Sequence, residues 1–301
     1  MIGPTLGTLY PEIVEGGLRI DDAFKNSAFY IYRSAADAKR GVAEGGTGFL
    51  VTVRHKVNKR YAAMYAVTNA HIIRAFNTPT FRLNTHAGKI TTEGTKKSDW
   101  VIHPGGDDIA VLPFARYDDY KIRAIPEEHF FNKATLHKHL FGVGDEIFMV
   151  GRFVGHEGRA KNLPSVRFGN ISMVPDEPIR YQNDEQEAFL VELRSIGGYS
   201  GSPVFIWWPI TEQGRSTTAL LLGIDCGHIQ TTEPVHTKGR RTIGYVSFNS
   251  AMAVVSPVWR IRELLDSPVV LEQREKEDAL ITERKGVGNY SIDWMRLIRE
   301  R

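Results

Sequence analysis

Three short segments of the sequence contain residues that could carry out nucleophilic chemistry. A serine, Ser200, lies between small residues in GYSGSP (198–203), directly before an apolar run. A histidine, His71, ends the segment YAVTNAH (65–71), and an aspartate, Asp108, precedes the apolar run IAVL (109–112). A hydroxyl nucleophile needs a base that takes its proton, a carboxylate that holds the base, and N–H donors for the charge that develops on the substrate oxygen. The three segments offer each of these groups.

Each segment, taken alone, also has a structural explanation. Glycine-serine loops are common turns, and a histidine that follows a strand often has a packing role. An aspartate at the entrance of a buried strand needs a partner, or it is an ordinary strand cap. Asp107 is a second candidate for the carboxylate, because it stands directly before Asp108. The three patterns together, in the order His, Asp, Ser, indicate a catalytic arrangement.

The elements that must position these residues are predicted to be β-strands. From Ala28 onward the chain consists of short β-branched and aromatic runs broken by Gly, Asn and Asp, which is typical of an antiparallel all-β protein. Ten such runs fit one closed barrel or two. The predicted strands are residues 29–32, 48–54, 61–68, 109–114, 146–151, 165–171, 189–193, 203–207, 220–225 and 242–248.

Changes in pattern divide the chain into five parts. Residues 1–26 form an N-terminal extension, 27–116 a first β half with His71 and Asp108, and 142–258 a second β half with Ser200. Residues 117–141 lack alternation and predict a connector with a short helix. The last part, 259–301, is a C-terminal helix and a charged tail. Apolar spacing predicts a helix over 258–265 and a second amphipathic piece over 292–298.

The composition predicts a water-soluble globular protein. Hydrophobic residues make up 42% and charged residues 24% of the chain, and no run is long and apolar enough to cross a bilayer. The 38 Lys and Arg and 35 Asp and Glu are spread along the chain, so neither nucleic acid nor a membrane is expected as a partner. The single cysteine, Cys226, excludes an internal disulfide. The start lacks the pattern of a secretory signal, so with Met1 as the native start we expect a cytoplasmic protein.

Together, the segments resemble those of the chymotrypsin-like (trypsin-like) serine proteases, and most of all the bacterial high-temperature-requirement type. The resemblance runs from about residue 45 to about residue 258 and rests on TGFLV (47–51), TNAH (68–71), DIAVL (108–112) and GYSGSP (198–203). The family implies two packed six-stranded antiparallel β-barrels with the catalytic cleft between them, followed here by a C-terminal helical extension. Members of that type commonly carry a PDZ domain after the barrels, for which the tail here is too short.

The resemblance also assigns roles to individual residues. It implies a serine endopeptidase that cleaves protein substrates through an acyl-enzyme intermediate, without a metal or other cofactor. His71 would be the general base and then the general acid, Asp108 would hold its tautomer, and Ser200 would be the nucleophile. The amides of Gly198 and Ser200 would form the oxyanion hole. The family pattern of aspartate, aliphatic, Ala, Val, Leu selects Asp108 over Asp107.

Three further residues are expected at the substrate site through the resemblance. Arg194, six residues before the nucleophile, stands where substrate charge preference is usually set, so we expect an acidic side chain at the cleavage position. Asp225 aligns beside the same pocket and could neutralise Arg194, which would leave a polar or small pocket. Cys226 matches the position whose backbone pairs with the substrate as an added strand.

The sequence departs from the digestive members of the family at Tyr199. Those enzymes carry there an aspartate that captures a newly freed N-terminus and completes the oxyanion hole, so activation by clipping is not expected. The hole would form constitutively or be ordered by a partner or ligand, and we expect partner control. The candidate docking segment for a partner is the C-terminal tail, through Trp294, Met295, Leu297 and Ile298.

Other interpretations concern the class of the protein and its metals. A catalytically silent peptide-binding module could use the same cleft, and a protease subunit of a bacterial stress or defence assembly would cut only when a sensor is triggered. Metal binding is not expected, because His137 with His139 and His156 with Glu157 lack third and fourth ligands at the spacing of a zinc site.

Overall fold

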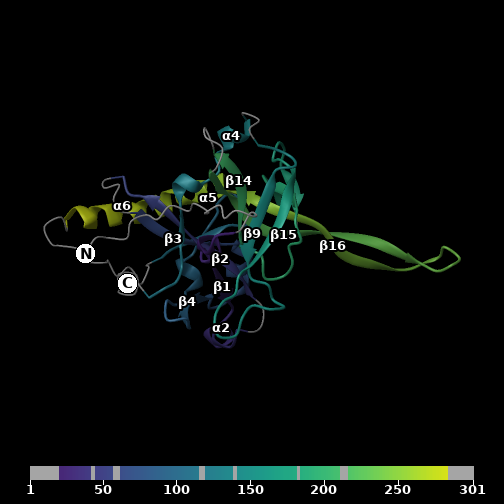
Figure 1. The fold of residues 1–301 in the computed structure, drawn as a ribbon, viewed down its shortest axis with the longest axis horizontal. Helices are drawn as coiled ribbons and strands as arrows, with labels where there is room; N and C mark the ends of the chain where they lie inside the picture. The colour runs from purple at the N-terminus through teal and green to yellow at the C-terminus, as the bar shows by residue number, and fades with distance from the viewer. Residues whose placement is uncertain are drawn as a thin grey trace.

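The structure is a computed structural model that describes residues 20–41, 45–56, 62–114, 119–137, 141–181, 184–210 and 216–283. Antiparallel β-sheet dominates it, in two halves that lie against each other (Figure 1). The predicted all-β class with a C-terminal helical part is confirmed. No helix within the described ranges is long and apolar enough to cross a membrane.

The first half is an eight-stranded sheet, where the resemblance implies six strands. Seven strands follow the order β5-β4-β1-β2-β3-β7-β6, and β8 pairs in parallel with β2. Because β8 lies in segment 117–141, the predicted connector contributes a strand to this sheet. The strands are β1 (Ala28–Tyr32), β2 (Gly45–Arg54), β3 (Ala62–Thr68), β4 (Thr80–Asn84), β5 (Ile90–Gly94), β6 (Val101–Ile102), β7 (Ala110–Pro113) and β8 (Ala124–Pro126).

The second half closes into a barrel of six strands in the order β10-β13-β16-β15-β14-β9. Its six strands agree with the prediction for this half. They are β9 (Glu146–Gly151), β10 (Ser165–Met173), β13 (Phe189–Glu192), β14 (Pro203–Ile210), β15 (Ser216–His236) and β16 (Thr242–Pro257). A separate two-stranded hairpin is formed by β11 (Ile179–Tyr181) and β12 (Asp184–Gln186).

All ten predicted runs form strands, but six further strands lack a clear signal in the sequence. Most of these are short or half-exposed, and such strands carry little of the apolar alternation on which prediction rests. β4 was missed for another reason: its Arg82 is fully buried. Arg82 donates to Asn162 Oδ1 at 2.8 Å, so a polar residue stands where the pattern requires an apolar one.

Most helices are short and lie at the ends of strands. The predicted helix α5 (Val258–Leu265) has the predicted bounds and buries its apolar face against the barrel, and α6 (Pro268–Glu283) follows it. The predicted piece at 292–298 lies outside the described residues. The other helices are α1 (Asp22–Lys25), α2 (Ala35–Arg40), α3 (Ala70–Ala75), α4 (Lys133–His137) in the connector, and the 3₁₀ turns η1 (Lys97–Asp99) and η2 (Glu127–His129).

One hydrophobic cluster joins the two halves. Phe49 from the first half and Phe148 and Phe205 from the second belong to it. Phe24 of α1, which the sequence assigns to an extension, is also part of it and packs edge-on against the Phe148 and Phe205 rings, with centroids 5.2 and 5.0 Å away. The halves therefore share their interior, and the folded part begins before residue 27.

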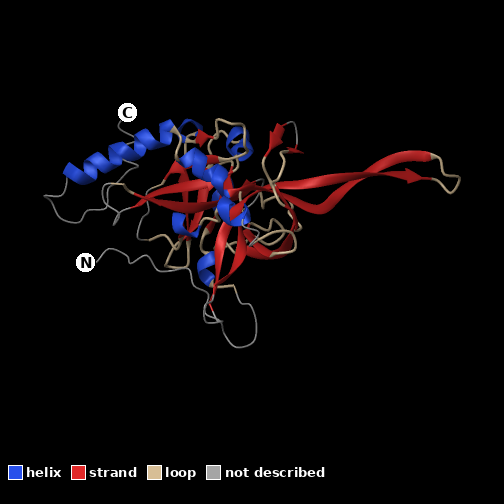
Figure 2. Cartoon of the chain, turned by 90° about the horizontal axis from the view of Figure 1, so that it is seen from above, coloured by secondary structure: helices blue, strands red, loops and turns tan. Residues whose placement is uncertain are grey.

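β15 and β16 are much longer than predicted and leave the barrel as a two-stranded ribbon. Residues 230–249, called the arm below, project far from the body of the molecule (Figures 1 and 2). The pairing continues from Gln230 opposite Asn249 to His236 opposite Thr242, at the tip. The arm begins at the wall of the pocket that the next section describes.

Candidate active site

His71 and Asp108 form a tightly bonded pair. The backbone N–H of His71 donates to Asp108 Oδ1 at 2.8 Å, and His71 Nδ1 lies 2.6 Å from Asp108 Oδ2. Since a carboxylate only accepts hydrogen bonds, Nδ1 carries the proton and Nε2 is left as an acceptor. Asp108 thus determines both the position and the tautomer of the histidine ring.

Local structure brings this pair together. β3 ends at Thr68, and Asn69 in extended conformation begins α3, so His71 lies in the first turn of that helix. The side chain of Asn69 donates to the backbone oxygen of Asp108 at 2.9 Å, which ties the start of α3 to the segment just before β7. Because β3 and β7 are neighbouring antiparallel strands, their ends place His71 and Asp108 side by side.

Ser200 follows a tight turn that leaves two N–H groups available. The N–H of Tyr199 donates to the Ile196 oxygen at 3.1 Å, and Gly198 has a φ of +97°, a value that glycine adopts without strain. A Cβ at Gly198 would lie 2.9 Å from the backbone oxygen of Arg152. Within the described part of the chain, the N–H groups of Gly198 and Ser200 have no hydrogen-bond partner.

Thr47 of β2 holds this turn from the opposite half of the molecule. Its hydroxyl donates to the Gly198 oxygen at 2.8 Å and accepts the N–H of Arg152 at 3.0 Å, and its own N–H donates to the Ser200 oxygen at 2.9 Å. The sequence shows Thr47 only as part of a strand. Its partner is 151 positions away, so no local signal could have revealed this contact.

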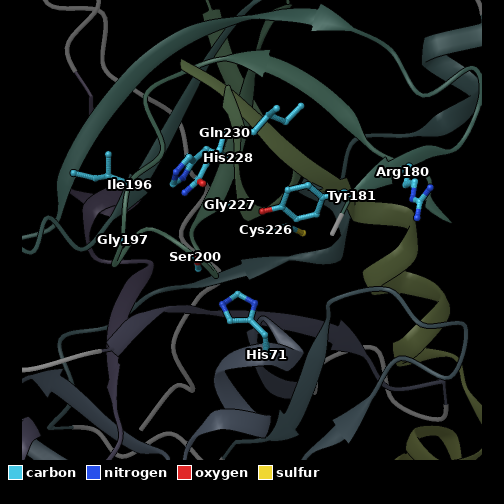
Figure 3. Close-up of a pocket in the computed structure, with 11 residues that line it drawn as sticks. His71, Arg180, Tyr181, Ile196, Gly197, Ser200, Cys226, Gly227, His228 and Gln230 are labelled. Atoms are coloured by element: carbon cyan, nitrogen blue, oxygen red, sulfur yellow. The ribbon is translucent and has the colours of Figure 1, made fainter. Parts of the chain in front are cut away.

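The ring of His71 and the backbone turn of Ser200 line one open pocket between the halves (Figure 3). The remaining wall comes from the loop before Ser200, from β15 and from the β11–β12 hairpin. The lining residues are His71, Arg180, Tyr181, Ile196, Gly197, Ser200, Cys226, Gly227, His228, Ile229 and Gln230. The described residues form no hydrogen bond between the Ser200 hydroxyl and His71, a contact that often closes only when substrate binds.

Asp107, the rival carboxylate, is part of a different cluster. It is buried, accepts from Arg260 Nε at 2.9 Å, and lies 3.0 Å from His103 Nδ1. Burial raises its pKa, but the hydrogen bonds from His103 and Arg260 outweigh burial and bring the pKa below its usual value. The geometry therefore joins Asp108, and not Asp107, to His71.

The predicted pairing of Arg194 with Asp225 is wrong. Arg194 is exposed and does not line the pocket, whereas Asp225 is fully buried and accepts a hydrogen bond from Ser195 Oγ at 2.7 Å. The backbone turns at Arg194, where the N–H of Ser195 donates to the Leu193 oxygen at 2.8 Å, and of these two neighbours it is Ser195 that bonds Asp225. Burial, opposed by the Ser195 hydrogen bond, raises the pKa of Asp225 to about 7.

A cation does line the pocket, but it is Arg180 of β11. The sequence offered no signal for it, because β11 is a three-residue strand far from the motifs. Glu185 stands opposite Arg180 in the hairpin, and no ion pair joins these two described side chains. No carboxylate lines the pocket within the described residues, so the charge of Arg180 is not neutralised by another lining residue.

Cys226 lines the pocket just beyond the point where β15 stops pairing with β14. Its thiol is buried, and burial raises its pKa well above the usual value, so the neutral form is favoured. Asn69 Nδ2 lies 3.7 Å from the sulfur. Beyond Ile224, β15 no longer pairs with β14, so the backbone from Cys226 onward borders the pocket as an open strand edge.

Tyr199, at the position where digestive members of the family carry an aspartate, is anchored inside the second barrel. The side chain is fully buried, its hydroxyl is hydrogen-bonded to Ser165, and the Arg167 guanidinium lies 4.7 Å from the ring centroid. The Tyr199 side chain therefore contacts residues of the second barrel.

The histidine and glutamate pairs weighed as metal ligands lie apart from the pocket. Glu157 binds the buried guanidinium of Arg152 through Nε at 2.5 Å, while His156 is exposed. The side chain of His137 and all of His139 lie outside the described residues. In the ranges given above, no group of three or more His, Cys, Asp or Glu could hold a metal ion.

Comparison with protein families places these residues in a known context. The family model described as trypsin-like peptidase domain matches residues 46–206, which is more than half of the chain. The chain belongs to the trypsin-like peptidases. The match covers all three segments around His71, Asp108 and Ser200 in this peptidase, and it confirms the predicted family.

Solved structures with similar folds are distant in sequence. The MamO protease domain of Magnetospirillum magneticum is 15% identical with a TM-score of 0.49, and the match covers 81% of this peptidase and 98% of that chain. Deg5 is 15% identical with a TM-score of 0.46, covering 80% and 88%. Human heparin binding protein is 14% identical with a TM-score of 0.46, covering 84% and 95%. No curated protein sequence matches this peptidase.

Proposed function

We propose that this trypsin-like peptidase is an active serine endopeptidase whose triad is Ser200, His71 and Asp108. The observation that carries the proposal is the meeting of these groups at one pocket. His71 is held by Asp108 at 2.6 Å with Nε2 left as an acceptor, and Ser200 borders the same pocket, where the N–H groups of Gly198 and Ser200 have no partner among the described residues. A catalytically inactive peptide-binding protein would not require a histidine oriented by an aspartate, a serine at the same pocket and N–H donors beside that serine.

The proposed reaction follows from the protonation states. His71 Nε2 takes the proton of the Ser200 hydroxyl as the oxygen attacks the scissile carbonyl, and the N–H groups of Gly198 and Ser200 stabilise the oxyanion. The imidazolium then gives its proton to the leaving amine, and an acyl-enzyme forms on Ser200 Oγ. Water, deprotonated by His71, hydrolyses the ester and restores the hydroxyl. Asp108 stabilises the charged ring throughout.

The substrate is proposed to bind as an extended peptide along the open edge of β15 from Cys226 onward. We retain the preference for acidic side chains, now supported by Arg180 in place of Arg194. A peptide library would show enrichment of Asp or Glu near the cleaved bond, and Arg180→Ala would weaken that enrichment. Cleavage chiefly after Lys or Arg would contradict this preference.

The decisive experiment on catalysis is labelling with a fluorophosphonate probe, which reacts only with an activated serine. The wild type is expected to be labelled, and Ser200→Ala is expected to lose the label. The matched control is Ser202→Ala, which removes the buried hydroxyl two residues away. Absence of labelling in the folded wild type would favour a peptide-binding module. Labelling without digestion of unfolded casein would favour control by a partner.

A further inference from the structure

The arm exposes an unusual amount of apolar surface for a thin element. Five of its large apolar side chains are between 41% and 74% exposed, namely Val235, Ile243, Tyr245, Val246 and Phe248. These side chains are divided between the two faces of the ribbon, because Tyr245 and Val246 are consecutive strand residues. A two-stranded ribbon is at best marginally stable in water, and large apolar side chains exposed on it mark an interaction site. The arm is therefore built to be covered by another strand or surface.

The two outer edges of the arm differ in how well they could accept a further β-strand. The edge of β15 carries Glu233 and Pro234, and a charge and a proline both discourage strand addition. The edge of β16 has no proline before Pro257, and four of the five exposed apolar side chains belong to β16. β13 pairs with residues 252–255 of β16, and the N–H of Leu193 donates to the Ala251 oxygen at 2.9 Å, so the edge without a neighbouring strand in the described structure is residues 242–249.

We propose that β16 is a dimerisation strand, which pairs edge to edge with β16 of a second copy of this chain. The two arms would run antiparallel around a two-fold axis and form a four-stranded sheet in the order β15-β16-β16-β15. Such an interface is self-complementary, because each copy contributes the same strand. It converts two marginal ribbons into one sheet.

The register follows from the regular part of the edge. The pairing of β16 with β15 is irregular near its tip and at Ser250–Ala251, which leaves about residues 243–249 as a regular strand with Val246 at its middle. Side chains that face each other across two strands must lie on the same side of the sheet. The two-fold axis therefore passes between the two copies of one residue, which faces itself. With the axis at Val246, each Phe248 faces Gly244 of the other copy, where a Cβ would meet nothing within 4 Å. An aromatic ring beside a strand glycine is a stabilising pair.

Charge at the two ends of the arm favours a second copy as the occupant. The tip carries Lys238, Arg240 and Arg241. In the proposed register Thr242 faces Ser250 of the second copy, so the basic tip reaches the base of the second arm. The exposed Glu192 of β13, opposite Met252, lies at that base. At each end of the paired sheet the basic tip therefore reaches the carboxylate of Glu192, which stands beside the exposed Arg194.

The dimer would leave both clefts open. The pocket is lined on this side by residues 226–230 of β15 and by Ile196 and Gly197, whereas the proposed interface pairs along residues 243–249 of β16. Loss of the dimer should therefore not change cleavage of a short peptide or labelling of Ser200. The proposal is consequently tested independently of the proposed catalytic function.

The first test is the mass of the full chain by analytical ultracentrifugation over a range of concentrations. The wild type is expected to reach twice the 33.9 kDa of one chain. Val246→Lys places two like charges opposite each other at the axis and should weaken the dimer at least tenfold. Val235→Lys, on the same face but on β15, should retain it. A wild type that stays monomeric at every concentration, or equal effects of the two variants, overturns the proposal.

The second test does not depend on a loss of function. Neighbouring strands lie about 5 Å apart, so Val246→Cys would face its own copy within disulfide reach. Glu233→Cys, on the paired strand opposite Val246, would be about three strand spacings from its copy. Under mild oxidation only Val246→Cys should give a reducible dimer, since the native Cys226 is buried. No link through position 246, or an equal link through position 233, contradicts the register.

Discussion

The carboxylate of Asp108 receives two hydrogen bonds from one residue, the N–H of the His71 backbone and the His71 ring. An asparagine at this position would present one acceptor and one donor, and the donor would favour the wrong ring tautomer. We therefore expect Asp108→Asn to lower kcat for a peptide substrate by roughly 10⁴-fold with little change in KM. The measurement is steady-state hydrolysis.

The control for Asp108→Asn is its neighbour. Asp107→Asn breaks the cluster with His103 and Arg260 and should lower the melting temperature, but folded enzyme should keep most of its kcat. A comparable loss of kcat in both variants would show that the two aspartates do not have separate roles.

A second prediction at the residue scale concerns pH. Burial raises the pKa of Asp225 to about 7, whereas an exposed aspartate titrates near 4. Between these values the folded state keeps a proton that the unfolded state has released, so stability should fall as pH rises from about 4 to about 7. The slope from one such group is at most about 1.4 kcal/mol per pH unit.

The variant that tests this linkage is Asp225→Asn, which retains an acceptor for Ser195 Oγ. Its free energy of unfolding, measured by urea titration across this pH range, should lack the downward contribution and exceed that of the wild type above pH 7. Parallel pH profiles of the two proteins would show that Asp225 is not the group responsible.

At the scale of elements, β2 positions the turn that leads to Ser200 through Thr47. Thr47→Val keeps the shape of the side chain but leaves the Gly198 oxygen and the Arg152 N–H without a partner. We expect a loss of stability of about 1–3 kcal/mol. Because the turn carries the proposed oxyanion donors, we also expect a fall in kcat of about 10–100-fold, since a single donor contributes up to about 10³-fold.

Thr95 provides a matched control for Thr47→Val. Its buried hydroxyl also donates to a carbonyl oxygen, that of Pro79 at 2.8 Å, and accepts an N–H, from Trp100 at 2.9 Å. Thr95→Val should therefore lose similar stability without a change in kcat. Equal kcat values in the two variants would mean that Thr47 serves folding alone.

At the scale of the whole molecule, the shared core predicts that both halves unfold together. Phe24 is 1% exposed and packs against Phe148 and Phe205 of the second barrel from a helix that precedes the first sheet. Phe24→Ala should lower the free energy of unfolding by about 3–5 kcal/mol and leave a single transition. Phe168→Ala, at a phenylalanine that is 60% exposed, should cost much less. Two separate transitions in denaturant would contradict the shared core.

Local patterns were sufficient for the proposed catalytic groups and for the fold class. TNAH, DIAVL and GYSGSP identify His71, Asp108 and Ser200 because each segment couples a reactive residue to a strand end or to glycines, and both features can be read within a few residues. The ten predicted strands and the helix α5 were found for the same reason, since apolar periodicity is a local property. The short strands with polar or exposed faces carry no such signal.

Only the tertiary structure decided which groups meet across the molecule. The bond of Thr47 to Gly198, the exposure of Arg194 and the entry of Arg180 into the pocket depend on contacts between distant elements. The arm is a related case: strand periodicity predicts β16 but says nothing about where its neighbour β13 ends. Pairing partners, not residue patterns, determine which edges remain free, and partners are settled only when the whole chain packs.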